Sequence, residues 1–172
     1  MPTAIEKLFS ECYPSREPWA RKGDSGKLLV ISGSLEYSGS PIFNAMAALR
    51  SGADLVTVIG HERAMNIVAA YAPDIITIAL PHELSPEDVS MVLERTKHAT
   101  GMVIGSGLPR THETYEAIRA IVKDATLPMV LDAEAIRAIA GHEEILSGKS
   151  VLMTPNAKEF EVLMGKDASD NA

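Results

Sequence analysis

Cysteine is almost absent from the sequence, and this scarcity excludes two ways of stabilising a protein. Cys12 is the only cysteine among 172 residues. A single thiol can form no intrachain disulfide and no cysteine metal cluster. This composition fits a reducing compartment, so we expect a cytoplasmic protein stabilised by an ordinary hydrophobic core.

Long apolar runs and excess positive charge are also missing. No apolar stretch approaches the roughly 20 residues that a membrane helix needs, and the N-terminal segment MPTAIEKLFSEC lacks the apolar core of a signal peptide. The net charge is −7, whereas nucleic-acid binding needs a basic surface. We therefore predict no membrane and no nucleic-acid partner. A nucleotide remains compatible, because backbone N–H groups can bind phosphates locally.

The remaining composition is typical of one globular domain. Apolar residues make up 46% of the chain and charged residues 23%, as in ordinary soluble proteins. We expect residues 1–172 to form a single domain, because this length suits one hydrophobic core. Residues 1–26 are predicted to add an N-terminal helix and a loop.

Short apolar runs alternate with longer helical stretches along the chain. Strands are predicted at 27–32, 55–59, 74–79, 102–104, 128–131 and 151–153, and helices at 41–50, 62–70, 86–97, 112–123, 133–140 and 157–164. Apolar strands separated by helices of about 10 residues are typical of βαβ units. We therefore predict a three-layer α/β fold with a mostly parallel sheet covered on both faces.

Two glycine-containing loops follow predicted strands, where such sheets bind ligands. The first, 33–41 (GSLEYSGSP), precedes a helix; the second, 105–110 (GSGLPR), precedes Thr111, a predicted helix cap. Glycine lets backbone N–H groups approach a ligand closely, and a helix N-terminus favours an anion. A flexible connector is the structural alternative for the first loop. The second is not the GxGxxG fingerprint, because position 110 is arginine.

Three further polar residues stand at strand ends, and each has two interpretations. Asn156 and Glu159 have the spacing of a capping box, which would by itself explain both. Alternatively, their side chains point into a cleft, where a carboxylate can organise the hydration shell of Mg²⁺. Asp132 either caps the next helix or places a carboxylate at the mouth of the cleft.

Six segments, taken in order, resemble the NAD(P)H-hydrate dehydratase family of the ribokinase-like superfamily. They are 22–27 (KGDSGK), 33–41 (GSLEYSGSP), 47–53 (AALRSGA), 104–108 (IGSGL), 131–135 (LDAEA) and 154–160 (TPNAKEF). The resemblance runs from about Lys22 to the C-terminus. It implies a ribokinase-like fold and a lyase that repairs nicotinamide cofactors. Such enzymes phosphorylate the ring hydroxyl of hydrated NADH or NADPH with ADP or ATP and Mg²⁺, and loss of phosphate regenerates NAD(P)H.

The resemblance also implies roles for single residues. Tyr37 lies in the segment that favours this family, and Ser40 stands where the family usually has a substrate-contacting alanine. Gly105 and Gly107 match a glycine loop that approaches the substrate. Asn156 stands where the bacterial pattern has a substrate-contacting histidine.

On the metal side, the resemblance links Glu159, and with it Asp132, to Mg²⁺ and phosphate. The family also commonly self-associates, which implies a homo-oligomer. Three positions depart from the family pattern: Ser106 replaces a proline, Pro109 a glycine and Lys158 a glycine.

The family's catalytic aspartate belongs to a G-x-G-D motif that the sequence through Ala172 does not contain. We therefore expect that the catalytic residue lies beyond Ala172 and that the given sequence is a fragment. We also expect that this chain alone is inactive. A shortened natural paralogue is the alternative. Two other functions remain open: a small-molecule kinase of the same superfamily, such as a thiazole kinase, and a non-catalytic nucleotide-binding or assembly subunit.

Overall fold

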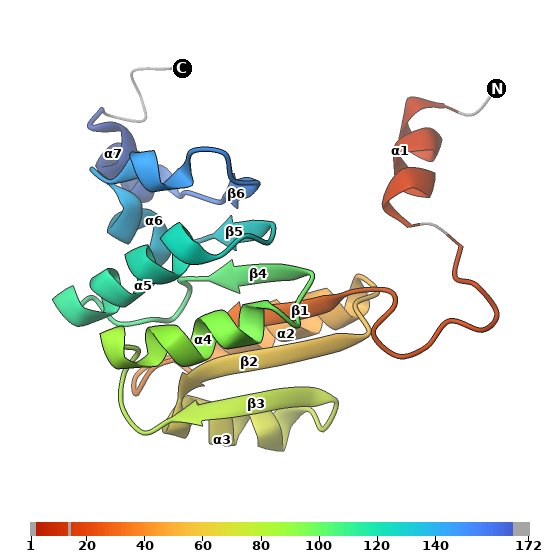
Figure 1. Cartoon of the computed structure of the whole chain (residues 1–172), viewed down its shortest axis with the longest axis horizontal. Coiled ribbons are helices and arrows are strands. Elements are labelled where there is room, and N and C mark those ends of the chain that lie inside the picture. Colours follow the sequence, from red (N-terminus) through yellow and green to blue (C-terminus); the bar gives the residue numbers. More distant parts are fainter. Residues whose placement is uncertain (1–2, 14, 167–172) are drawn as a thin grey trace.

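The computed structural model describes residues 3–13 and 15–166. The chain forms a six-stranded sheet with helices on both faces (Figure 1). The strands are β1 (Lys27–Ile31), β2 (Leu55–His61), β3 (Ile75–Leu80), β4 (Gly101–Ile104), β5 (Met129–Leu131) and β6 (Val151–Met153). The α-helices are α1 (Ala4–Cys12), α2 (Gly39–Arg50), α3 (Glu62–Tyr71), α4 (Val89–Thr96), α5 (His112–Asp124), α6 (Glu134–Ile139) and α7 (Ala157–Met164).

The strand order is β3-β2-β1-β4-β5-β6, and every pairing is parallel. The chain first builds the sheet outward from β1 to β3 and then crosses back to place β4 on the other side of β1. The loops after β1 and β4 therefore lead away from each other to opposite faces of the sheet. Such a switch point opens a crevice at the carboxyl ends of the strands, where ligands bind in this class of fold.

The core consists of two apolar layers, one on each face of the sheet. α2 and α3 cover β1–β3 on one face, and α4, α5 and α6 pack on the other face. β1 contributes to both layers, because Val30 faces the first and Ile31 the second, and both are fully buried. Burial on both faces explains why this strand is a continuous apolar run.

The predicted parallel α/β fold is confirmed, with local differences at element ends. The helix predicted at 86–97 begins as a 3-10 turn, η1 (Pro86–Asp88), because Ser85 and Asp88 form a capping box around Pro86. A second 3-10 turn, η2 (Glu143–Leu146), was not predicted. β2 continues two residues beyond the predicted end, to His61. Among the described residues, no helix is both long and apolar enough to cross a membrane.

Gly60 allows β2 to pass close to the end of β1, and replacing it should destabilise the fold. A Cβ atom at Gly60 would lie 2.1 Å from the carbonyl oxygen of Ser32. We expect Gly60→Ala to lower the free energy of unfolding by about 1–3 kcal/mol, because backbone atoms must move. Gly101→Ala is the matched control, since its Cβ would meet its nearest atom at 3.5 Å. Urea denaturation of both variants checks this, and equal stability would contradict it.

Candidate active site

A cleft of about 560 Å³ lies at the carboxyl edge of the sheet, at the switch point between β1 and β4. Its walls are the segments 34–37 and 107–111 together with the side chains of Ser40, Glu83 and Glu134. The two loops singled out in the sequence therefore face the same space. Tyr37, Ser40 and Gly107, all predicted to contact substrate, line this cleft.

The loop after β1 is held in place through its backbone. The buried Ser34 accepts a hydrogen bond at Oγ from the N–H of Tyr37 (3.0 Å), which closes a tight turn. Leu35 donates its N–H to Oε1 of Glu83 (2.8 Å) and accepts at its carbonyl from Nη1 of Arg63 (2.9 Å). The loop is thus fixed from α3 and from the segment after β3, so a flexible connector does not describe it.

Gly105 and Gly107 have different tasks in the loop after β4. A Cβ atom at Gly105 would lie 1.9 Å from the carbonyl oxygen of Asp132, so only glycine fits there. At Gly107 the backbone has a φ of +71°, and a Cβ atom would lie 3.0 Å from Cβ of Ser40. Gly105 therefore brings the ends of β4 and β5 together, whereas Gly107 lets the loop after β4 pack closely against Ser40 in the wall of the cleft. The predicted substrate contact of Gly105 stays a prediction.

Ser106, which replaces a proline of the family pattern, links the two loops. Its carbonyl accepts a hydrogen bond from Oγ of Ser32 (2.5 Å), and its hydroxyl accepts one from Nδ2 of Asn44 on α2 (2.6 Å). Proline has no side-chain acceptor for Asn44. Serine at position 106 therefore adds a link between α2 and the loop after β4, whereas the bond from Ser32 uses a backbone carbonyl that proline also has.

The side chains around Glu134 form a hydrogen-bonded network that the sequence did not predict. Glu134 is only 6% exposed. Its Oε1 accepts from Nε of Arg110 (2.8 Å) and its Oε2 accepts from the hydroxyl of Tyr115 (2.6 Å). Burial, followed by this hydrogen bond, raises the pKa of Tyr115 from 10.0 to about 12. The bond from Arg110 to Glu134 raises the pKa of Arg110, so the cleft keeps a fixed cation.

The position of Glu134 depends on an unusual backbone conformation just before it. Ala133 has φ 48° and ψ −112°, and it is the only non-glycine residue with positive φ among those described. Such conformations cost on the order of 1–3 kcal/mol and persist only where the surroundings enforce them. Here the N–H of Ala135 donates to the carbonyl of Asp132 (3.0 Å) across Ala133, and α6 starts with Glu134 beside the cleft.

Asp132, Asn156 and Glu159 lie at the ends of β5 and β6, outside the lining of this cleft. Oδ1 of Asp132 accepts a hydrogen bond from Oγ1 of Thr154 (2.8 Å), which joins the two strand ends. Glu159 accepts from the backbone N–H of Asn156 (3.0 Å) and from its Nδ2 (2.6 Å), while Oδ1 of Asn156 accepts from the N–H of Glu159 (3.0 Å). The capping-box interpretation is therefore confirmed.

The acidic residues at these strand ends do not form a metal site by themselves. Over residues 3–13 and 15–166, no group of three or more His, Cys, Asp or Glu side chains is placed to hold a metal ion. Both carboxylate oxygens of Glu159 are already engaged by Asn156. Mg²⁺ usually keeps several waters and takes substrate phosphates as ligands. The residues present therefore fit Mg²⁺ carried by a nucleotide, with Asp132 as the accessible carboxylate.

The parallel sheet and its strand order give the chain a ribokinase-like α/β fold. The model of the NAD(P)H-hydrate dehydratase family matches residues 28–171. The chain therefore belongs to the NAD(P)H-hydrate dehydratase family.

Three known proteins illustrate this relationship. The chain is 38% identical over 156 residues to the bifunctional NAD(P)H-hydrate repair enzyme Nnr of Pyrobaculum aerophilum, covering 89% of this chain and 30% of that protein. It is 32% identical over 164 residues to the ATP-dependent (S)-NAD(P)H-hydrate dehydratase of Entamoeba histolytica, covering 93% of this chain and 54% of that protein.

The third is a solved structure, the ADP/ATP-dependent NAD(P)H-hydrate dehydratase of Bacillus subtilis co-crystallised with ATP/Mg²⁺. It superposes with a TM-score of 0.70 at 20% identity, over 92% of this chain and 54% of that chain. This likeness shows the fold. The chain spans about half the length of the ATP-dependent relatives and less of the bifunctional one.

The network around Glu134 generates a prediction for alkaline pH. Because folding raises the pKa of Tyr115 to about 12, the unfolded chain releases the Tyr115 proton near pH 10 and the folded chain does not. The contribution of Tyr115 to the free energy of unfolding is therefore complete below pH 10, and it is lost as the pH rises towards 12. Unfolding free energies measured across this window should fall more steeply for the natural chain than for Tyr115→Phe. Parallel curves would contradict the assignment.

Proposed function

We propose that the whole protein regenerates NADH or NADPH from its hydrated form, with ADP or ATP as the phosphoryl donor. One observation carries this proposal: the segment that the family model matches also folds the loops 33–41 and 105–110 around one cleft at the switch point. The relatives named above support the substrate and the nucleotide through the activities in their names. A cytoplasmic location, compatible with the single cysteine, belongs to the same proposal.

We assign the hydrated nicotinamide to the space between Tyr37, Ser40 and Gly107. The ring of Tyr37 is exposed at the cleft, where it offers a flat apolar surface to the ring of the ligand. At Gly107 the absence of a side chain lets the backbone approach Ser40 closely in the wall of the cleft, where a Cβ would lie 3.0 Å from Cβ of Ser40. Arg110, held by Glu134, supplies a cation for the phosphates of the dinucleotide. Gly105 shapes this loop by letting β4 approach β5 closely, and Asn156, at the end of β6 and outside the cleft lining, stays a predicted substrate contact.

The nucleotide and Mg²⁺ are assigned to the side of Asp132 and Glu159. When bound, Mg²⁺ neutralises charge on the phosphates during transfer. Asp132 would supply a carboxylate oxygen to the hydrated ion, whereas Glu159 would act indirectly by fixing Asn156 and the start of α7. The ring hydroxyl attacks the terminal phosphorus and loses its proton to a base, while the bond from that phosphorus to the bridging oxygen breaks and the shortened nucleotide leaves. Departure of phosphate and loss of a ring proton then restore the reduced nicotinamide. We assign no residue of this chain as that base.

Gly107 and Gly148 form a matched pair for testing the substrate site. Both have positive φ, +71° and +73°, so alanine strains the backbone equally at either position. Only Gly107 borders the cleft, whereas a Cβ at Gly148 would meet nothing within 4 Å. We expect Gly107→Ala to weaken binding of NADPH hydrate about tenfold or more, and Gly148→Ala to leave it unchanged. Calorimetric titration of both folded variants checks this; equal losses would place the ligand elsewhere.

Product analysis separates the proposed repair reaction from a small-molecule kinase. We expect whole protein, NADH hydrate, ATP and Mg²⁺ to yield the near-ultraviolet absorbance of NADH together with one phosphate per NADH formed. A stable phosphate ester of another alcohol, with the hydrate unchanged, would favour the kinase instead. Binding of ATP without turnover of either substrate would favour a non-catalytic subunit.

A further inference from the structure

Two arginine side chains approach the same carboxylate oxygen in the wall of the cleft. Oε1 of Glu134 accepts a hydrogen bond from Nε of Arg110 at 2.8 Å, and Nε of Arg137 lies 3.8 Å from the same oxygen. The longer distance allows an ion pair but not a hydrogen bond. Nε of Arg137 is buried, and it has no hydrogen-bond partner among the described residues. Glu134 therefore has one arginine bound and a second one beside it.

The two arginines differ in their freedom to move. Arg110 belongs to the loop after β4, and its side chain is 69% exposed at the cleft. Arg137 lies on α6, one helical turn after Glu134, and its side chain is only 18% exposed. Residues three apart on a helix stay neighbours. Arg110 can therefore turn toward a ligand, whereas Arg137 stays beside Glu134.

The charges of this group leave one cation over for a ligand. Glu134 is buried and carries one negative charge, while Arg110 and Arg137 together carry two positive charges. Without Arg137, a phosphate at Arg110 would compete with Glu134 for a single guanidinium. A buried carboxylate that loses its counter-ion is strongly destabilising, and the hydroxyl of Tyr115, which also donates to Glu134 (2.6 Å), brings no charge. With Arg137, each of the two anions has its own cation.

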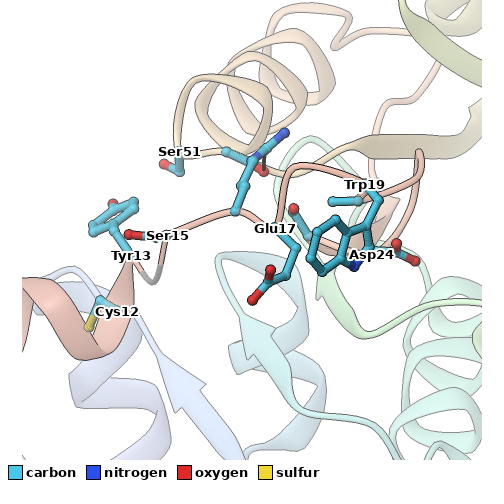
Figure 2. Close-up of a pocket in the computed structure, with 11 residues that line it drawn as sticks. Cys12, Tyr13, Ser15, Glu17, Trp19, Asp24 and Ser51 are labelled. Atoms are coloured by element: carbon cyan, nitrogen blue, oxygen red, sulfur yellow. Dashed lines mark hydrogen bonds between the residues drawn. The ribbon is translucent and has the colours of Figure 1, made fainter.

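The arginine in the other large hollow has no such second cation beside it. Figure 2 shows this hollow of about 570 Å³ between the segment before β1 and the rest of the domain, with Tyr13 on one side and Trp19 on the other. Arg16 donates Nη2 to the carbonyl of Gly52 (2.7 Å) and pairs through Nη1 with Asp54 (3.0 Å). Among the described residues, Arg16 is the one cation that pairs with Asp54. An anion there would have to break this pair, so the doubled arginine distinguishes the cleft.

We propose that Arg137 is a positioning residue for phosphate binding in the cleft. When a phosphate of the substrate binds, Arg110 turns its guanidinium from Glu134 to the phosphate oxygens, and Nε of Arg137 donates to Oε1 of Glu134 instead. The hydrogen bonds exchange without any change in covalent bonds, and Glu134 keeps a counter-ion throughout. The inference rests on the proposed function for the identity of the substrate, but the exchange itself requires only a ligand that carries phosphate.

Calorimetric titration of the whole protein with NADPH hydrate tests this role. We expect Arg137→Met to weaken binding about tenfold, as for the loss of a charged partner, and Arg137→Lys to restore most of the affinity. The double variant with Arg110→Met should bind no more weakly than Arg110→Met alone, because Arg137 acts through Arg110. Arg119→Met is the matched control and should bind normally, since it also removes a cation beside α6, where Arg119 donates to the carbonyl of Ala138 (3.3 Å).

The outcome separates a positioning role from a structural one. Circular dichroism checks that each variant is folded. Unchanged affinity in Arg137→Met, an equal loss in Arg119→Met, no restoration by Arg137→Lys, or losses that add in the double variant would each overturn the proposal.

Inorganic pyrophosphate, titrated without Mg²⁺, separates the exchange from the proposed function. It should bind the natural protein and be weakened by Arg137→Met in the same way as the hydrate. Pyrophosphate binding that depends on Arg137, without binding of either hydrate, would contradict the proposed function and support the exchange. A natural protein that binds neither pyrophosphate nor hydrate would reject both.

Discussion

The close contact between Gly105 and the carbonyl of Asp132 determines the shape of the crevice. Because no side chain fits between them, the ends of β4 and β5 approach to a distance that only glycine permits. The chain then leaves β5 through the strained Ala133, and α6 begins with Glu134 at the cleft. Glu134 in turn holds Arg110 and Tyr115. An ion pair and a tyrosine hydroxyl from three segments thus meet at Glu134, next to this backbone contact.

The layers of the fold and the glycine loops could be predicted from the sequence, but the network around Glu134 could not. Strands such as β1 are continuous apolar runs, so their number and parallel pairing could be predicted. Glycine at 105 and 107 predicted close backbone approach because the loop stands between a strand and a helix. By contrast, alanine gives no sign of the φ of 48° at Ala133, and Glu83 follows β3 without a glycine signal. Side chains that meet only through long-range folding leave no local pattern.

The sheet was predicted to be covered by helices on both faces. It is covered only where a connection between two strands places a helix on that face. α2 and α3 cover β1–β3 on one face, whereas α4 alone serves the long return from β3 to β4 on the other. A single helix cannot cover every strand it crosses, so β2 and β3 keep an apolar strip. The strip follows from strand order, which periodicity along the sequence does not reveal.

The side chains of Glu83 and Arg63 hold the loop after β1 by hydrogen bonds to the main chain of Leu35. The side chain of Leu35 takes no part in these hydrogen bonds, and it borders the cleft. Loop shape and cleft chemistry are therefore separable at this one position. A library of side chains at residue 35 would vary what a ligand meets while leaving the backbone where it is, which makes Leu35 a natural starting point for redirecting specificity by directed evolution.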